Sequence, residues 1–260
     1  MDKTKIEWCD ASWNPVTGCK HSCDYCYARG VAHRFCTQMW GADGATHVLD
    51  ERKYFDNAPD GEYNMLQYVC DPYPYEFDPT FHRYRLDVPQ KWAKPRNIFV
   101  CSMADLFGEW VPDSWIREVF AACEAAPQHR YLFLTKNPIR YTQLATEIMS
   151  AKAELWCGAT ITGCYMRRDQ VPHFEHVTAR RFLSIEPLTG NNLPKIGLYG
   201  GVLDWVILGA ETGRRKNKTK PERGWIQDIA DGCREANIPL YMKDNIKPYW
   251  DGELVTQFPW

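Results

Sequence analysis

Three cysteines on one short loop are the residues best suited to do chemistry. Cys19, Cys23 and Cys26 stand at C-x3-C-x2-C spacing, and no fourth cysteine follows at a matching interval. Thiolates hold iron–sulfur clusters, and a [4Fe–4S] cube needs four ligands. Three cysteines therefore predict such a cluster with one iron left open to a small molecule.

Zinc is the alternative metal for this loop. Zinc accepts three thiolates together with one further ligand. The nearby candidates for that ligand are His21, His33, Cys9 and Cys36. Structural zinc sites usually combine two C-x2-C-like knuckles at a distance, and no second knuckle exists here. The spacing favours the cluster, and a zinc-binding, nucleic-acid-binding module without catalysis is the alternative.

The composition indicates a reducing, cytoplasmic setting. Eleven cysteines are an odd number for a disulfide framework, and the first seven residues are too polar for an export signal. No apolar run is long enough to span a bilayer, which argues against a membrane protein. The net charge is −2, so any binding of nucleic acid must depend on local charge.

Short apolar runs that alternate with helical patterns predict an α/β fold with a parallel sheet. Strands are expected near residues 12–16, 97–101, 131–134, 155–160, 182–185, 205–208 and 239–242. Helices are expected over residues 113–123, 139–148 and 225–233. Six or seven strands are too few for a closed eight-stranded barrel. The prediction is one domain over residues 1–260, a partial (βα)6-type TIM barrel that begins with the cysteine loop.

Two segments interrupt this rhythm. A helix is expected from Tyr27 through Phe35, and residues 36–96 then form a long irregular insertion or lid, rich in Tyr, Asp and Pro. The second segment is a basic loop over residues 214–223. Its six basic residues are Arg214, Arg215, Lys216, Lys218, Lys220 and Arg223. This loop is a candidate phosphate contact, and a merely solvated loop is the alternative.

Polar side chains stand where the predicted strands end, which is the catalytic mouth in α/β barrels. They are Ser102, Asp105, Thr135, Lys136, Thr160, Thr162, Ser184, Glu186, Glu211, Lys243 and Asp244. For Asp105, Thr162 and Asp244, capping of a following helix is the alternative role.

The cysteine loop, with Tyr25 directly before its last cysteine, resembles that of the radical S-adenosylmethionine superfamily. Residues 13–19, 96–107, 134–136, 182–188 and 204–213 are similar to a phage-type family of uncharacterised three-cysteine-motif proteins, over nearly the whole chain. The loop here is more compact than in many relatives, and Ala210 stands where a second glycine is common. Residues 23–27 are also similar to the cluster loop of spore photoproduct lyase, a radical enzyme that acts on DNA bases.

This resemblance implies the cofactors and the residues that hold them. Cys19, Cys23 and Cys26 would hold a [4Fe–4S] cluster, and S-adenosylmethionine would bind the open iron and be cleaved reductively to a 5′-deoxyadenosyl radical. Tyr25 would lie near the adenine. Oxygen acceptors for the rest of the cofactor would be Ser102 and Asp105 at its amino group, and Thr135, Ser184 and Glu186 at its ribose or carboxylate.

The remaining charged groups at the strand ends are predicted to serve the substrate. Glu211, Lys136 and Lys243 offer charge and proton transfer at the rim, and an ion pair between Glu211 and Lys243 is the alternative. The expected electron donor is an external flavodoxin or ferredoxin. A nucleobase, nucleotide or nucleic acid is the expected substrate, with a peptide or small metabolite as the alternative.

Overall fold

The structure is a computed structural model, and it describes residues 4–36, 42–52, 54–56, 68–70, 72–163, 179–213 and 215–260. Residues 54–56 and 68–70 are described by their backbone alone. Among the helices of these residues, none combines the length and the apolar character needed to cross a membrane.

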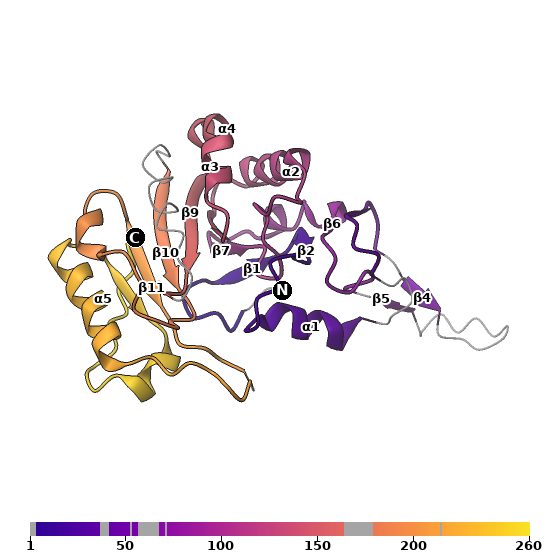
Figure 1. The fold of residues 1–260 in the computed structure, drawn as a ribbon. Helices are drawn as coiled ribbons and strands as arrows, with labels where there is room; N and C mark the ends of the chain where they lie inside the picture. Colours follow the sequence, from indigo (N-terminus) through magenta and orange to yellow (C-terminus); the bar gives the residue numbers. More distant parts are fainter. Residues whose placement is uncertain are drawn as a thin grey trace.

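A curled parallel sheet organises the fold (Figure 1). Within the described residues it has seven strands, in the order β1-β7-β8-β9-β10-β11-β12, and every neighbouring pair is parallel. The strands are β1 (Ala11–Trp13), β7 (Asn97–Val100), β8 (Arg130–Thr135), β9 (Glu154–Ile161), β10 (Arg180–Ile185), β11 (Trp205–Leu208) and β12 (Leu240–Met242). The predicted partial TIM barrel is confirmed, and seven is the larger of the two strand numbers that the sequence indicated.

The strands are apolar at most positions because both faces of the sheet are buried. Successive side chains of a strand point to opposite faces. On β10, Leu183 and Ile185 pack in the outer core, while Phe182 packs in an inner aromatic cluster. The inner cluster consists of Trp8, Phe99, Leu132, Trp156, Phe182, Trp205, Ile207 and Tyr241. Large aromatic rings therefore fill the inside of the half-barrel, and this inner cluster is called the aromatic floor from here on.

Helices cover the outer face of the sheet (Figure 1). These are α2 (Asp113–Glu124), the short α3 (Ile139–Gln143) and α4 (Ala145–Ser150), and α5 (Arg223–Glu235). The two long helices, α2 and α5, each follow a proline-containing turn and bury one apolar stripe, which in α5 consists of Ile226, Ile229 and Cys233. The short 3-10 segments η4 (Ile196–Tyr199) and η5 (Asp244–Tyr249) also belong to this half of the chain.

The helix α1 (Tyr27–Phe35) follows the cysteine loop with the predicted bounds. The segment after it is more regular than the sequence indicated. Its strands β3 (His47–Leu49) and β6 (Thr80–His82) join β2 (Val16–Thr17) in a small sheet, and β4 (Tyr54–Asp56) pairs with β5 (Tyr68–Cys70). Two 3-10 turns, η1 (Arg83–Arg85) and η2 (Pro89–Lys91), then lead into β7.

The open side of the half-barrel, between β1 and β12, is bridged by the residues that precede β1. The Tyr241 hydroxyl donates to the Glu7 carbonyl at 3.3 Å, and the Asp244 amide donates to Glu7 Oε2 at 2.9 Å. Trp8, 2% exposed, packs against Phe99 at 4.7 Å between ring centroids. Both ends of the described chain thus help to close the aromatic floor, because Trp205 Nε1 also donates to the Gln257 carbonyl at 2.9 Å.

Gly158 tests this inner packing. A Cβ built there would lie 2.3 Å from the Phe182 ring. We expect Gly158→Ala to lower the free energy of unfolding by about 1–3 kcal/mol through overpacking, as measured by urea denaturation. Gly224→Ala is the control, because Gly224 lies in α5 with nothing within 4 Å of its added Cβ, and it should be neutral or stabilising. Equal effects of the two substitutions would contradict this account of the floor.

Candidate functional site

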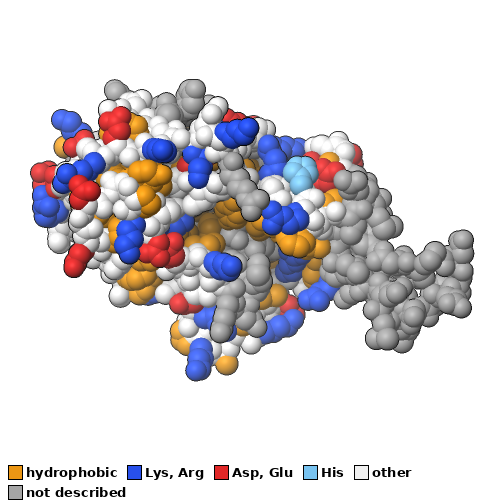
Figure 2. Space-filling view, turned by 90° about the horizontal axis from the view of Figure 1, so that it is seen from below, with side chains coloured by type: hydrophobic (Ala, Val, Ile, Leu, Met, Phe, Trp, Pro, Cys, Tyr) orange, Lys and Arg blue, Asp and Glu red, His pale blue; other side chains and the backbone are white. Residues whose placement is uncertain are grey.

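One cavity of about 220 Å³ lies at the C-terminal edge of the parallel sheet, beneath the cysteine loop. All twelve candidate site residues line it: Cys19, Cys23, Cys26, Tyr25, Ser102, Asp105, Thr135, Lys136, Ser184, Glu186, Glu211 and Lys243. The parallel strands cause this convergence, because their C-terminal ends all face the same way. Figure 2, which views the molecule from below Figure 1, shows a hollow in this face with hydrophobic side chains in its depth.

The cysteine loop is attached to the rest of the fold through its backbone. The Gly18 amide donates to the Met103 carbonyl at 2.9 Å, and the Cys19 amide donates to the Phe77 carbonyl at 3.0 Å. Gly18 has a φ of +85°, and a Cβ there would lie 2.1 Å from the Asp78 carbonyl oxygen. Glycine is therefore required before the first cysteine, both by conformation and by space.

The last cysteine of the loop begins α1. Cys26 is the N-cap residue, and its Sγ accepts a hydrogen bond from the Arg29 amide at 3.4 Å. The partial positive charge of a helix N-terminus favours a thiolate or another anionic group at this position. The local fold thus suits Cys26 to be a metal ligand.

The three thiols line one cavity but are not drawn together at one point. Among the described residues, Asp43, His47 and Asp78 are the only group of three potential ligands whose ligand atoms all lie within 4.8 Å of one another. At least one pair of sulfurs among Cys19, Cys23 and Cys26 is therefore farther apart than 4.8 Å.

Burial raises the pKa of the Cys19 thiol to about 12 in the metal-free chain. The neighbouring Asp105 carboxylate contributes to the rise in pKa, and Lys136 opposes it. Cys19 is therefore a neutral thiol at neutral pH unless a cation lies beside its sulfur.

Asp105 ties the loop to the sheet. Its Oδ2 accepts hydrogen bonds from His21 Nε2 at 2.7 Å and from the Lys136 amide at 2.9 Å, and its Oδ1 accepts from the Phe107 amide at 3.1 Å. Asp105 is 5% exposed. Burial alone would raise its pKa, but the hydrogen bond and charge of His21, with the other donors, hold the pKa below its ordinary value.

The turn after β7 presents two neighbouring residues to the cavity. Cys101 is buried in the left-handed region with φ of +60°, and its amide donates to the Trp13 carbonyl at 2.8 Å. Ser102 Oγ donates to Asn14 Oδ1 at 3.1 Å, and the Ser102 carbonyl accepts from the Tyr27 hydroxyl at 2.5 Å. A positive φ in a residue other than glycine is uncommon, and here it marks the wall of the site.

Glu211 and Lys243 at the rim each form an ion pair with another residue, and not with each other. Lys243 Nζ pairs with Glu186 Oε1. Glu211 instead accepts two hydrogen bonds from Arg215, both at 2.7 Å, and these lower the pKa of its carboxyl group. The ion pair between Glu211 and Lys243 is therefore not formed, because Arg215 of the basic loop binds the Glu211 carboxylate instead.

A second cavity of about 500 Å³ adjoins the first on the other side of the cysteine loop. Lys136 and Tyr25 line both cavities, and Lys136 Nζ lies 5.9 Å from the centroid of the Tyr25 ring. Four threonines add hydroxyl groups to the second cavity: Thr160, Thr162, Thr189 and Thr219. Arg215 also lines it, and Arg215 Nη1 lies 4.0 Å from Asp24 Oδ2.

Three cationic side chains of the basic loop bind partners within the protein. Besides the pairing of Arg215, Lys218 Nζ donates to the Gly213 carbonyl at 3.0 Å, and Arg223 lies 3.0 Å from Asp251. Arg214 lies outside the described residues.

Several residues of the site carry no clear signal in the sequence. His21 is predicted there only as a zinc ligand, and Cys101 only as the last residue of a strand, yet both line the first cavity. Tyr27, Trp8 and Phe99 also line it. The position of Cys101 at the end of a predicted strand is the one signal that points to the site, since strand ends meet at the mouth.

Comparison with solved structures defines the class of fold. A cysteine-to-serine mutant of spore photoproduct lyase has a TM-score of 0.53 at 10% identity, covering 93% of this chain and 78% of that chain. Spore photoproduct lyase complexed with dinucleoside spore photoproduct has a TM-score of 0.44 at 10% identity, covering 85% of this chain and 59% of that chain. A tyrosine-to-phenylalanine mutant gives 0.45 at 9% identity, over 86% of each. The first likeness shows that the two proteins share a fold.

The sequence itself matches a family model. Residues 3–250 match the family described as protein of unknown function (DUF5131), and the chain belongs to this family. No curated protein matches the sequence.

The lowered pKa of Asp105 predicts how its contribution to stability depends on pH. Because the folded-state pKa lies below the ordinary value of 3.8, the carboxylate stabilises the fold above that pH and less as the pH falls through the folded-state pKa. Asp105→Asn should lower the free energy of unfolding by about 1.5–3 kcal/mol at neutral pH, because an amide cannot accept all three hydrogen bonds.

Urea denaturation at several pH values measures this difference. The gap between the unchanged protein and Asp105→Asn should narrow in acid. The exposed Asp228 supplies the control, and Asp228→Asn should change stability little at any pH. A gap for Asp105→Asn that is independent of pH would contradict the proposed linkage.

Proposed function

We propose that the protein is a radical S-adenosylmethionine enzyme that modifies a nucleobase, nucleotide or nucleic acid. Cys19, Cys23 and Cys26 would hold a [4Fe–4S] cluster, with S-adenosylmethionine at the open iron. The observation that carries this proposal is the shared cavity, in which three thiols face the polar ends of parallel strands. The fold shared with spore photoproduct lyase supports the same chemistry.

The donor set fits an iron–sulfur cluster. Three thiols line one cavity, and three thiolates on a cube leave its fourth iron open to a ligand. When bound, such a cluster would supply the electron that cleaves S-adenosylmethionine to methionine and a 5′-deoxyadenosyl radical. The zinc-binding module is the weaker candidate, because structural zinc sites usually combine two cysteine knuckles and the sequence has no second one.

The depth of the cavity is suited to protect reactive chemistry from water. Ile6, Trp8, Phe99 and Leu134 line it, and apolar walls exclude solvent and stray hydrogen-atom donors. Trp8 is 2% exposed, and its Nε1 has no hydrogen-bond partner among the described residues. A buried donor without a partner is costly, and a polar ligand atom in this cavity would satisfy it.

The hydroxyl and carboxylate groups of the walls would orient the cofactor. Ser184 is 1% exposed and Thr135 is 1% exposed, so each can contact a ligand only from inside the cavity. Ser102 and Glu186 offer further oxygen acceptors. Asp105 already accepts three hydrogen bonds from the protein, so we assign it chiefly the task of holding the cysteine loop through His21.

Lys136, Lys243 and Glu211 would serve the substrate. Lys136 lines both cavities, so it would meet a substrate that enters the second cavity while the cofactor fills the first. Lys243 is held by Glu186, and Glu211 by Arg215, so each would donate or accept a proton only by leaving its partner. The electron would come from an external flavodoxin or ferredoxin.

A nucleic-acid or nucleotide substrate is supported by three features. The cysteine loop resembles that of spore photoproduct lyase, the second cavity is lined by hydroxyl groups and cationic side chains, and the basic loop borders it through Arg215 and Thr219. Cationic and hydroxyl side chains are ordinary contacts to phosphate and sugar. A peptide or small metabolite is the alternative substrate.

Removal of each cysteine tests the cluster and the cofactor. Purified without oxygen, Cys19→Ala, Cys23→Ala and Cys26→Ala should each lose the broad visible absorbance of the cluster. The unchanged protein, once reduced, should show an altered electron paramagnetic resonance spectrum on addition of S-adenosylmethionine and should form 5′-deoxyadenosine. Cys36→Ala is the control, because Cys36 lies at the far end of α1 and should keep iron and activity. Full iron and sulfide in all three variants would refute the assignment.

Two lysines of the basic loop test the substrate class. We expect Lys216→Gln with Lys220→Gln to weaken binding of single-stranded or duplex nucleic acid and to reduce its salt slope by about 1 for each phosphate that is no longer neutralised. Iron content should stay unchanged. Lys94→Gln with Lys152→Gln, exposed residues that precede β7 and β9 at the opposite edge of the sheet, is the matched control. If the unmodified protein binds no nucleic acid or nucleotide at low salt, this substrate class is excluded.

A further inference from the structure

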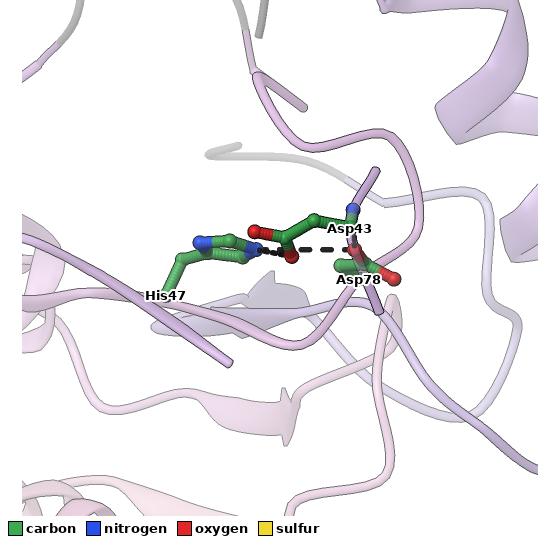
Figure 3. Close-up of side chains that lie close together, drawn as sticks. All are labelled: Asp43, His47 and Asp78. Carbon is green, nitrogen blue, oxygen red and sulfur yellow. Dashed lines mark hydrogen bonds and ion pairs between the residues drawn. The ribbon is translucent and has the colours of Figure 1, made fainter. Parts of the chain in front are cut away.

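A second group of potential metal ligands lies in the small sheet that supports the cysteine loop (Figure 3). His47 begins β3, Asp43 stands four residues before it, and Asp78 precedes β6. His47 Nε2 lies 3.1 Å from Asp43 Oδ1 and 3.8 Å from Asp78 Oδ2. The three side chains point toward one another in Figure 3. Local spacing does not indicate this group, because Asp78 lies far from the other two residues along the chain.

The imidazole of His47 is held in place between the two carboxylates. Its ring stacks on Tyr75 with 3.6 Å between centroids and 2° between planes. The His47 side chain is 12% exposed, and Nε2 itself is buried. Nε2 lies within ion-pair distance of Asp43 and Asp78, but it makes no well-aligned hydrogen bond among the described residues. A metal ion between the three groups would take this nitrogen and the two carboxylates as ligands.

The two carboxylates are positioned by backbone amides. Asp78 Oδ2 accepts from the amides of Asp43 at 2.9 Å and Gly44 at 2.8 Å, and Asp43 Oδ1 accepts from the Ala45 amide at 2.8 Å. These bonds order the oxygens before any ion binds. Ligand atoms on a tetrahedral zinc ion lie about 3.4 Å apart, given Zn–N and Zn–O bonds near 2.1 Å, and the two separations lie on either side of this value.

We propose that Asp43, His47 and Asp78 bind one divalent transition-metal ion of the zinc type. One imidazole and two carboxylates are a donor set for zinc, and water would complete the coordination. The pair of carboxylates carries more negative charge than one imidazole can neutralise, so a dication also balances the site.

A metal ion here would stabilise the turn on which the start of the cysteine loop packs. Asp78 belongs to the turn that packs on Gly18, and Phe77 beside it accepts the hydrogen bond from the Cys19 amide. Lys20 Nζ donates to the Gly44 carbonyl at 2.8 Å, within the same turn that holds Asp43. The site is distinct from the thiols, and this inference stands whether or not the loop binds an iron–sulfur cluster.

The test must separate this site from the thiolates, which also bind zinc. The first protein is therefore the full chain with Cys19→Ala, Cys23→Ala and Cys26→Ala together, freed of metal and titrated with Zn²⁺ against a chromophoric chelator. We expect one equivalent of zinc to bind and the midpoint of thermal unfolding to rise with zinc concentration. Adding His47→Ala or Asp78→Asn should weaken zinc binding at least about tenfold, which is 1.4 kcal/mol, and abolish the thermal shift.

His33→Ala is the matched control. His33 also faces a carboxylate, with Nδ1 3.7 Å from Glu76 Oε2, but its side chain is 56% exposed and belongs to no such group among the described residues. In the same background it should leave zinc binding unchanged. Equal zinc uptake with and without His47→Ala, or no uptake by the folded chain that lacks the three loop cysteines, would overturn the proposal.

Cobalt provides a second measurement if the chain without the three loop cysteines does not fold. With all cysteines present, Co²⁺ bound to thiolates gives intense sulfur-to-cobalt charge-transfer absorption, whereas Co²⁺ on imidazole and carboxylates gives only weak visible bands. Subtracting the Co²⁺ spectrum of His47→Ala from that of the unchanged protein should leave the weak bands without charge transfer. A flat difference spectrum would refute the site.

Discussion

The arrangement of the site depends on one buried carboxylate. Asp105 follows the second strand of the sheet and accepts hydrogen bonds from three directions: its own turn, the end of β8 and the cysteine loop. An unpaired charge at such a depth would be costly, so the Asp105 carboxylate is stable there only with its three hydrogen-bond donors. The loop is otherwise a short segment with little core of its own. Through His21, the position of the three thiols is fixed relative to the strand ends.

Much of this fold follows from local pattern. The runs that form β8, β9, β10 and β11 are apolar at most positions because helices cover one face and aromatic rings fill the other, and such runs are recognisable without a structure. Parallel strands also carry a rule about where their polar ends meet. The rule alone is enough to gather residues as distant as Ser102 and Lys243 into one group, and the cavity contains both.

Pairings between side chains could not be obtained in this way. Glu211 and Lys243 end neighbouring strands, so pairing them was reasonable, yet Arg215 lies four residues after Glu211 on a loop whose path no pattern specifies. His21 and Asp105 are 84 residues apart, and the group of Asp43, His47 and Asp78 depends on the course of a segment without periodicity. Contacts of this kind are decided by tertiary packing, which leaves no trace in local spacing.

The bridge between Glu7 and the last strand affects the order of folding. The hydroxyl of Tyr241 meets the Glu7 carbonyl across 234 residues of chain, and Trp205 binds the backbone near the other end at Gln257. Contacts that close such long loops form late. Closing the loop lowers the conformational entropy of the chain before enough other contacts have formed to offset that loss. During synthesis on the ribosome, the indole and phenyl rings of the half-barrel stay uncovered until both partners have emerged. Chaperone engagement and off-pathway association are then concentrated in that interval.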